Sequence, residues 1–255
     1  MTKRPKANNS FIKAIKYTAS ILVWIIIWHL VAMHIDKELF LPTPGKVFSV
    51  LWKDLLPSEN FYSSLGTSLL HICTGFFIGG IIGIILAIFS SISDMFKTFV
   101  WFPIKVMKSV PVASFVILVL LWLEADDLSV FIPAMIVLPT LYINTLTGIQ
   151  QTNDKLVDMA EIFRVPFFKR IVFIYIPSTI PYILSASSLA IGMAWKAGVA
   201  AEIIGLAKNT IGNELYKTKI YLMTPELFAW TLVIVALSIV CESVIKLGVK
   251  LIERK

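Results

Sequence analysis

Lys196 and Glu202 are the only charged residues between Ile171 and Ala207, a stretch of 37 residues. A charge at membrane depth costs roughly 2.5 to 3.5 kcal/mol on insertion scales, so it normally faces a partner, a cavity or a permeating ligand. Two interpretations stay open. The two side chains could pair with each other or extend to the external surface, or Lys196 could line a passage or its external gate and admit an anion.

Catalytic and metal-binding chemistry is not indicated elsewhere. Cys73 and Cys241 lie in apolar runs without CxxC spacing, and His29, His34 and His71 lack the spacing of metal ligands. The phosphate-binding pattern G-x-x-x-x-G-K-[ST] is also missing. We therefore predict no catalytic residue, no metal and no cofactor, and a chain that is not an enzyme. Any energy from ATP must come from a partner.

The composition predicts an integral membrane protein. Hydrophobic residues make up 57% of the 255 residues and charged residues only 15%, too few to cover the surface of a soluble domain. A membrane-spanning helix needs roughly 20 apolar residues. Six such runs predict an all-α fold with six transmembrane helices, in a single domain over 17–255 that follows a polar segment over 1–16. The predicted spans are about 17–33, 68–92, 104–123, 129–148, 172–194 and 228–249.

Several residues inside these spans predict how the helices pack. Gly75, Gly79 and Gly83 recur every four residues, which lets a neighbouring helix approach closely. In the third span, Lys105 and Lys108 are expected to extend toward a headgroup region. The segment 171–207 would reach about 55 Å as one helix. We therefore expect it to bend, break or re-enter, with Pro177 and Pro181 as break points.

The positive charges predict the orientation. Six spans place both termini on one side, and sixteen of the 23 Lys and Arg residues fall on that side, against six on the other. Because positive charge concentrates in cytoplasmic loops, both termini are expected in the cytoplasm, and the first span is expected to remain uncleaved. The basic pI is thus a topology signal, and it does not indicate nucleic acid as a partner.

The longest polar segment on the predicted cytoplasmic side is 150–171. Leu156, Met159, Ala160 and Phe163 follow each other at helical spacing and form one apolar stripe. Pro166 restricts the residue before it, so this short helix should end near Arg164. The pattern alone also fits a helix that lies on the membrane surface.

This segment resembles the EAA loop of binding-protein-dependent importer permeases, whose pattern is Glu-Ala-Ala, three residues, Gly, nine residues and Ile-x-Leu-Pro. The spacing fits without a gap, and Glu161 falls directly after the first triplet. Arg164 replaces the Gly, which would adopt a left-handed turn at no steric cost, so the turn is expected to be built differently, with Pro166 as the candidate residue. The matching positions are Asp158, Met159 and Ala160, then Arg164, then Ile174, Tyr175, Ile176 and Pro177.

The wider chain resembles the nitrate, sulfonate and taurine branch of these ABC importers, through the segments 41–44, 190–196 and 200–202. The resemblance implies the MetI-like permease fold in the bacterial plasma membrane and a dimer of two permease subunits, expected here as a homodimer. It also implies a cytoplasmic ATPase that grips the EAA helix and an extracytoplasmic solute-binding protein. The expected cargo is a small anionic solute of the sulfonate, nitrate or taurine kind. The alternative is an ion- or proton-coupled secondary transporter that uses Lys196 and Glu202.

Overall fold

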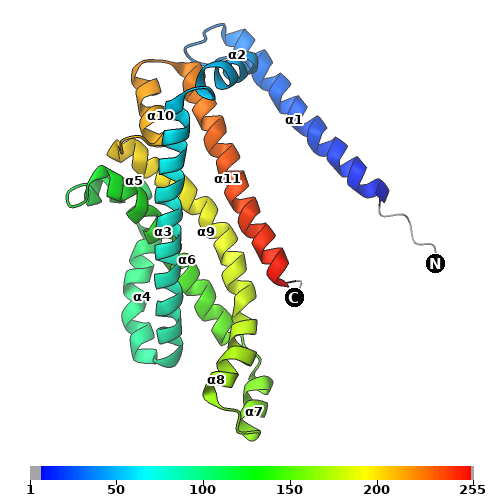
Figure 1. The fold of residues 1–255 in the computed structure, drawn as a ribbon, viewed down its shortest axis with the longest axis vertical. Coiled ribbons are helices and arrows are strands. Elements are labelled where there is room, and N and C mark those ends of the chain that lie inside the picture. Colours follow the sequence, from blue (N-terminus) through cyan, green and yellow to red (C-terminus); the bar gives the residue numbers. More distant parts are fainter. Residues whose placement is uncertain (1–6, 254–255) are drawn as a thin grey trace. The chain divides into compact units, whose positions relative to one another are not determined.

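The computed structural model describes residues 7–253, with side chains over 15–248; residues 1–6 of the predicted amino-terminal segment lie outside it. Every element in the described range is helical, as Figure 1 shows. The elements are α1 (Ala7–Ile35), α2 (Pro44–Val50), π-helical η1 (Leu51–Leu55), α3 (Glu59–Ile92), α4 (Asp94–Ser109), α5 (Val112–Val119), α6 (Ala125–Gln150), α7 (Asp154–Ile162), α8 (Phe167–Arg170), π-helical η2 (Ile171–Tyr175), α9 (Ile176–Gly205), α10 (Ile211–Ile220) and α11 (Thr224–Glu253).

Five described helices are long and apolar enough to cross a membrane, or six if the bent pair α4 and α5 counts as one span. They coincide with the six hydrophobic runs of the sequence. Four of the predicted spans lie within α1, α3, α6 and α11, each of which extends beyond its apolar run at one end or both. Hydropathy marks only the part of a helix that contacts lipid, so the helices are longer than the runs that predict them.

The third span differs from the straight helix predicted over 104–123. α4 begins at Asp94, ends at Ser109 and meets α5 at an angle of 106°. Val110 between them is extended, with φ −75° and ψ 128°. Val110 precedes Pro111, whose ring disfavours the helical conformation in the residue before it, and this explains the bend.

The interruption predicted within 171–207 is absent. Phe167–Gly205 forms one helical span of 39 residues, about 58 Å long at 1.5 Å per residue, so it is longer than a bilayer core. The π-helical η2 widens the turn just before Pro177, and Pro181 lies inside α9 without ending it. The chain leaves the helix only at Leu206, whose φ is 58°.

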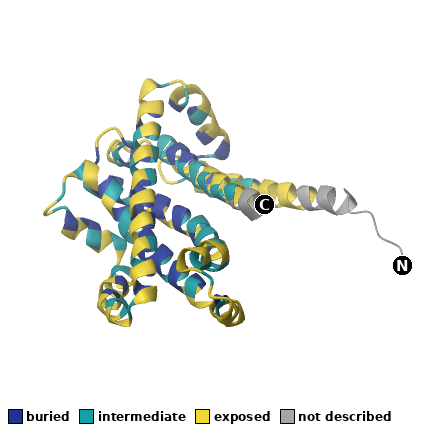
Figure 2. Cartoon of the chain, turned by 60° about the horizontal axis from the view of Figure 1, so that its bottom comes forward, coloured by how far each residue is buried: buried dark blue, intermediate teal, exposed yellow. Residues whose placement is uncertain are grey.

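The described chain divides into two compact units by its internal contacts. The larger unit takes in the described parts of 62–216 and 233–255, and α6 packs along α9 within it. The predicted close approach at Gly75, Gly79 and Gly83 is confirmed. A Cβ on any of the three would collide with a backbone oxygen of α6, namely that of Val130, Ala134 or Leu138. Figure 2 shows buried residues along the helices of this unit.

The smaller unit takes in the described part of 1–61 together with 217–232. Trp28 of α1 donates an Nε1–H hydrogen bond to the Pro42 carbonyl (3.1 Å) and stacks on Phe228 of α11, with ring centroids 5.9 Å apart. Pro44 begins α2, where its missing N–H costs nothing. These contacts join α1, α2 and the start of α11. A single functional domain over 17–255 stays a prediction.

Candidate functional site

The amphipathic helix predicted in the segment 150–171 is present as α7. Asn153 caps its amino terminus, because the Asn153 side-chain oxygen accepts a hydrogen bond from the Lys155 N–H (3.0 Å). The helix ends at Ile162, and Phe163 and Arg164 follow it, as predicted. α7 and α8 lie together at one end of the larger unit (Figure 1).

The turn after α7 is a left-handed cap, and the residue at its left-handed position is Arg164, with φ 52°. The Arg164 N–H donates to the Glu161 carbonyl (2.9 Å), and the Val165 N–H reaches back to the Ala160 carbonyl (2.8 Å). Such a pattern satisfies carbonyls at the end of a helix. The expectation of a differently built turn is therefore wrong. Arg164 adopts the conformation that the family pattern gives to Gly, and Pro166 instead caps α8.

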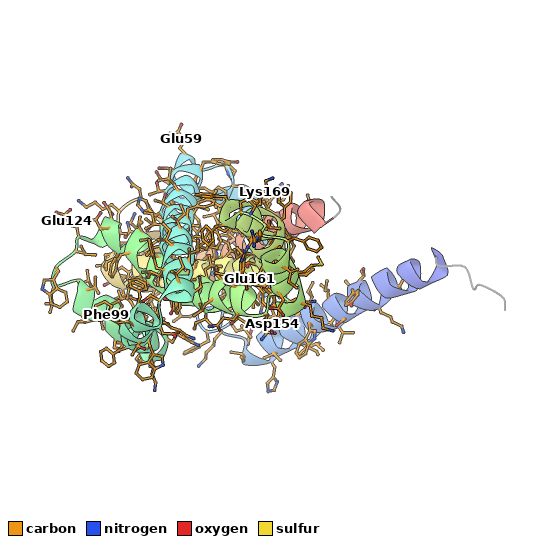
Figure 3. The ribbon with its side chains drawn as sticks, turned by 90° about the horizontal axis from the view of Figure 1, so that it is seen from below. Glu59, Phe99, Glu124, Asp154, Glu161 and Lys169 are labelled. Atoms are coloured by element: carbon orange, nitrogen blue, oxygen red, sulfur yellow. The ribbon has the colours of Figure 1, made fainter. Side chains whose placement is uncertain are left out.

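Arg170 stabilises this turn through its side chain, a role that the sequence did not indicate. Its Nε donates to the Val165 carbonyl (2.9 Å), and its guanidinium forms an ion pair with Glu161 (3.1 Å). Figure 3 looks at this end of the chain and labels Glu161 on α7 and Lys169 on α8. The ion pair joins residues nine positions apart, beyond the reach of the helical spacing rules. Only the folded turn reveals it.

The apolar stripe of α7 has two environments. Ala160 is buried, with 4% of its surface exposed, whereas Met159 is 51% and Phe163 72% exposed. The sequence placed all four residues in one stripe, and the structure shows that Ala160 packs inward while Leu156, Met159 and Phe163 are exposed. The outward apolar residues of α7, its end and α8, which we call the α7–α8 surface, are Leu156, Met159, Ile162, Phe163, Phe167 and Phe168.

Asp158 and the closing residues of the EAA pattern flank this surface. Asp158 is exposed on α7, Ile174 is half-buried in η2, and Pro177 is exposed near the start of α9. The Ser178 hydroxyl donates to the Ile174 carbonyl (2.8 Å). The pattern thus ends where the loop joins the spanning helix α9.

Lys196 is exposed and lines a cavity of about 480 Å³ between α4, α6 and α9. Lys108 of α4 lines the same cavity, together with Thr140 of α6. The sequence predicts that Lys108 extends toward a headgroup region, and the structure shows that it also lines the cavity that Lys196 lines. The remaining walls are mostly apolar, and they include Met107, Ile136, Pro139, Met193 and Ala197.

Glu202 lies elsewhere, fully buried within the larger unit. Its Oε2 accepts hydrogen bonds from the Ser68 hydroxyl (2.8 Å) and the Gly212 N–H (3.1 Å). Ser68 Oγ in turn accepts from the Ile211 N–H (2.9 Å). Glu202 therefore joins α9, α3 and the start of α10, and its bonded carboxylate oxygen does not face Lys196.

Comparison with known proteins decides the family. The family of binding-protein-dependent transport system inner membrane components matches residues 75–255. The chain belongs to this family. It is an inner-membrane, multi-pass, non-catalytic permease of a binding-protein-dependent ABC transporter, and that kind of transport implies an ATPase and a binding protein as partners. The membership decides against the secondary transporter.

Several curated relatives carry anion transport in their names. The permease is 25% identical over 235 residues to a Bacillus subtilis protein named as the aliphatic sulfonates transport permease SsuC, covering 91% of this chain and 83% of that one. It is 27% identical over 207 residues to the nitrate import permease NrtB of Synechococcus elongatus, covering 74% and 71%. It is 24% identical over 195 residues to the bicarbonate transport system permease CmpB of the same species, covering 73% and 70%.

A solved structure supports the fold. The permease matches a chain of a crystal structure of an amino acid ABC transporter with a TM-score of 0.63 at 19% identity, over 79% of this chain and 98% of that chain. The predicted permease fold is confirmed.

Proposed function

We propose that this permease imports a small anion of the sulfonate, nitrate or bicarbonate kind, and that Lys196 lines its pathway. The observation that carries the proposal is the cavity that Lys196 and Lys108 share. Two cations beside a largely apolar cavity attract an anion and repel a cation. The names of the curated relatives favour the same class of substrate.

The test of this substrate class is uptake by the assembled importer, the permease with its ATPase and its binding protein. Nitrate, an alkanesulfonate and bicarbonate are each offered to the wild type. Lys196→Ala should abolish most uptake of whichever anion the wild type accumulates. Lys196→Arg keeps the charge and should retain most of it. Full uptake by Lys196→Ala, at matched amounts of protein, would leave Lys196 a structural role only.

We further propose that the α7–α8 surface binds the ATPase on the cytoplasmic side, where both termini also lie. Six outward apolar residues at the end of a bundle form a patch that water solvates poorly and a partner can cover. The turn at Arg164 and the bonds of Arg170 hold this patch in one shape, so ATPase movement can be passed on to α9 as a rigid displacement.

Met159→Asp tests this docking. It should insert normally but reduce co-purification of the ATPase and uncouple ATP hydrolysis from uptake, because a buried unpaired carboxylate disrupts an apolar interface. Met159→Leu keeps the apolar contact and serves as the control. Ala160→Glu is less informative, because Ala160 is buried and its substitution disturbs the packing of α7 itself. Normal association and uptake in Met159→Asp would remove this assignment.

The permease is proposed to act as a homodimer. Its spans are too few for a complete two-sided pathway, so two copies are expected to enclose one. Two differently tagged copies of this chain should co-purify in the assembled importer; an importer that contains a single copy beside a different permease would contradict the homodimer.

A further inference from the structure

Three lysines lie along one face of α4. Lys97, Trp101, Lys105 and Lys108 are separated by four, four and three residues, so a helix places them within one narrow stripe. The rise from Lys97 to Lys108 is about 17 Å, more than half of a bilayer core. Lys105 Nζ lies over the Trp101 ring, 4.7 Å from its centroid.

This stripe borders a second cavity, of about 400 Å³, between α4 and α6. The three lysines and Trp101 line it from α4, and Thr147 and Gln150 supply polar groups from α6. Lys108 lines both this cavity and the one that Lys196 faces. The four lysines therefore form a continuous series from α9 to the start of α4. We call this series the lysine row.

The lysine row has no carboxylate partner in the described part of the chain. None of its four ammonium groups forms an ion pair there, whereas Lys46, Arg170 and Lys246 each pair with a glutamate. The acidic residues of α6 stay in its first turn, at Asp126 and Asp127, and α4 has only Asp94, at its start. Because an uncompensated cation is costly in contact with lipid, we expect these four lysines to face water, a headgroup or a passing anion.

We propose that the lysine row is a series of weak anion sites along which the substrate passes from the Lys196 cavity toward the end that carries α7 and α8. This inference rests on the proposed import of a small anion and adds the residues that conduct it. Several adjacent sites let an anion enter readily and still leave, because no single site holds it strongly. In this proposal Lys97, Lys105 and Lys108 select for negatively charged solutes, in addition to Lys196, which the sequence already indicates.

Trp101 provides a test that needs neither ATPase nor substrate. The full-length chain in a neutral detergent is titrated with iodide, caesium and acrylamide, and the signal of Trp101 is isolated by subtracting Trp101→Phe. Each quenching constant is divided by that of a free tryptophan amide. At low ionic strength the normalised iodide constant should exceed the caesium constant about tenfold, since a cleft lined by one sign of charge concentrates the opposite ion. Added salt should shrink the difference.

Replacing lysines of the row then tests whether their charges cause this preference for iodide. Lys97→Gln with Lys108→Gln should bring the iodide constant several-fold nearer to the caesium constant, while Lys105 over the ring keeps part of the preference. The acrylamide constant should stay unchanged, which shows that Trp101 keeps its exposure. Lys246→Gln removes one charge from α11 and is the matched control that should keep the wild-type ratio. Equal iodide and caesium constants in the wild type, or an unchanged ratio in the double variant, would overturn the lysine row.

A lipid phosphate is the competing occupant. In nanodiscs of phosphatidylcholine alone, the iodide preference should persist, and adding phosphatidylglycerol should change it little. Loss of the preference in phosphatidylglycerol, restored in Lys97→Gln, would show that the lysines hold lipid headgroups and would overturn the route.

Uptake completes the test and separates this inference from the proposed function. In the assembled importer, Lys97→Gln, Lys105→Gln and Lys108→Gln should each lower anion uptake several-fold while ATPase association stays normal. Normal uptake in all three would reject the route even if iodide gathers there. Wild-type importer that accumulates none of the three anions would instead refute the proposed substrate class, and the quenching result would still decide whether the row binds anions.

Discussion

At the scale of single residues, Arg164 carries a strained conformation in the coupling turn. Its φ of 52° costs an L-residue about 1–2 kcal/mol relative to the right-handed region, and Gly avoids the cost. The turn nevertheless keeps both capping hydrogen bonds, to Glu161 and Ala160. The local geometry is therefore set by the loop around it, with Arg170 as the side chain that ties Val165 and Glu161 together.

Replacing Arg164 by Gly should relieve this strain. Hydrogen exchange of the amides of α7 and the following turn should slow by about tenfold, equivalent to roughly 1.4 kcal/mol, because the closed turn no longer carries the strain and opens less often. Arg164→Val should accelerate exchange, since a β-branched residue resists positive φ more strongly. Arg164→Lys is the control that keeps both charge and strain. Identical exchange in the Gly and Val variants would refute the strained turn.

At the scale of the elements, two kinds of contact hold the larger unit together. The glycines of α3 let its backbone touch that of α6, and buried hydrogen bonds of Glu202 hold the start of α10 to α9 and α3. Gly212 adds a steric reason for this attachment, because a Cβ there would collide with Glu202. We propose that Glu202 supports an external gate by fixing α10, and that it does not meet the substrate.

Gly79→Ala should weaken the α3–α6 contact. The added methyl group has no room beside Ala134, so the helices must separate, at a cost of about 1–3 kcal/mol. The control is Gly66→Ala on the same helix, where nothing lies within 4 Å and the better helix propensity of Ala is expected to be neutral or stabilising. Thermal unfolding in detergent compares the two. A melting temperature equally lowered in both variants would contradict the packing argument.

Glu202→Ala leaves the Ser68 hydroxyl and the Gly212 N–H without their acceptor, each at a cost of about 1–3 kcal/mol when buried. We expect faster hydrogen exchange at the start of α10 and a lower melting temperature. Ser68→Ala should show a smaller effect, since Gly212 keeps its bond to Glu202. Exchange at α10 that stays at the wild-type rate in Glu202→Ala would remove the proposed gate support.

At the scale of the whole molecule, orientation decides whether the α7–α8 surface can meet an ATPase. Single cysteines in a Cys73→Ala, Cys241→Ala background test it. Lys155→Cys on α7 should react with an impermeant maleimide only after the cells are opened, and Lys208→Cys, which follows α9, should react in intact spheroplasts. The basis is the excess of cations on the proposed cytoplasmic side. The opposite labelling pattern would invert the topology and separate the loop from any ATPase.

The sequence by itself determined the spans, the amphipathic α7 and the family, because each depends on residues close together in the chain. Hydropathy is a local sum, helical stripes repeat within a few turns, and the EAA pattern occupies one short stretch. This dependence on neighbouring residues also limited what the sequence could predict. Neither the bend at Val110 nor the unbroken passage through Pro177 followed from composition, since neighbouring residues and the π-helical turn decide how a proline is accommodated.

Only the tertiary structure decided which side chains meet. Ser68 and Glu202 are 134 residues apart, and Lys108 and Lys196 lie on different helices, so no spacing rule could join either pair. Packing likewise turned Ala160 inward and left Met159 exposed on the same stripe, because a helix buries only the face that its neighbours cover. The lysine row arises in the same way, because α4 packs against α6 and lines one cavity together with α9.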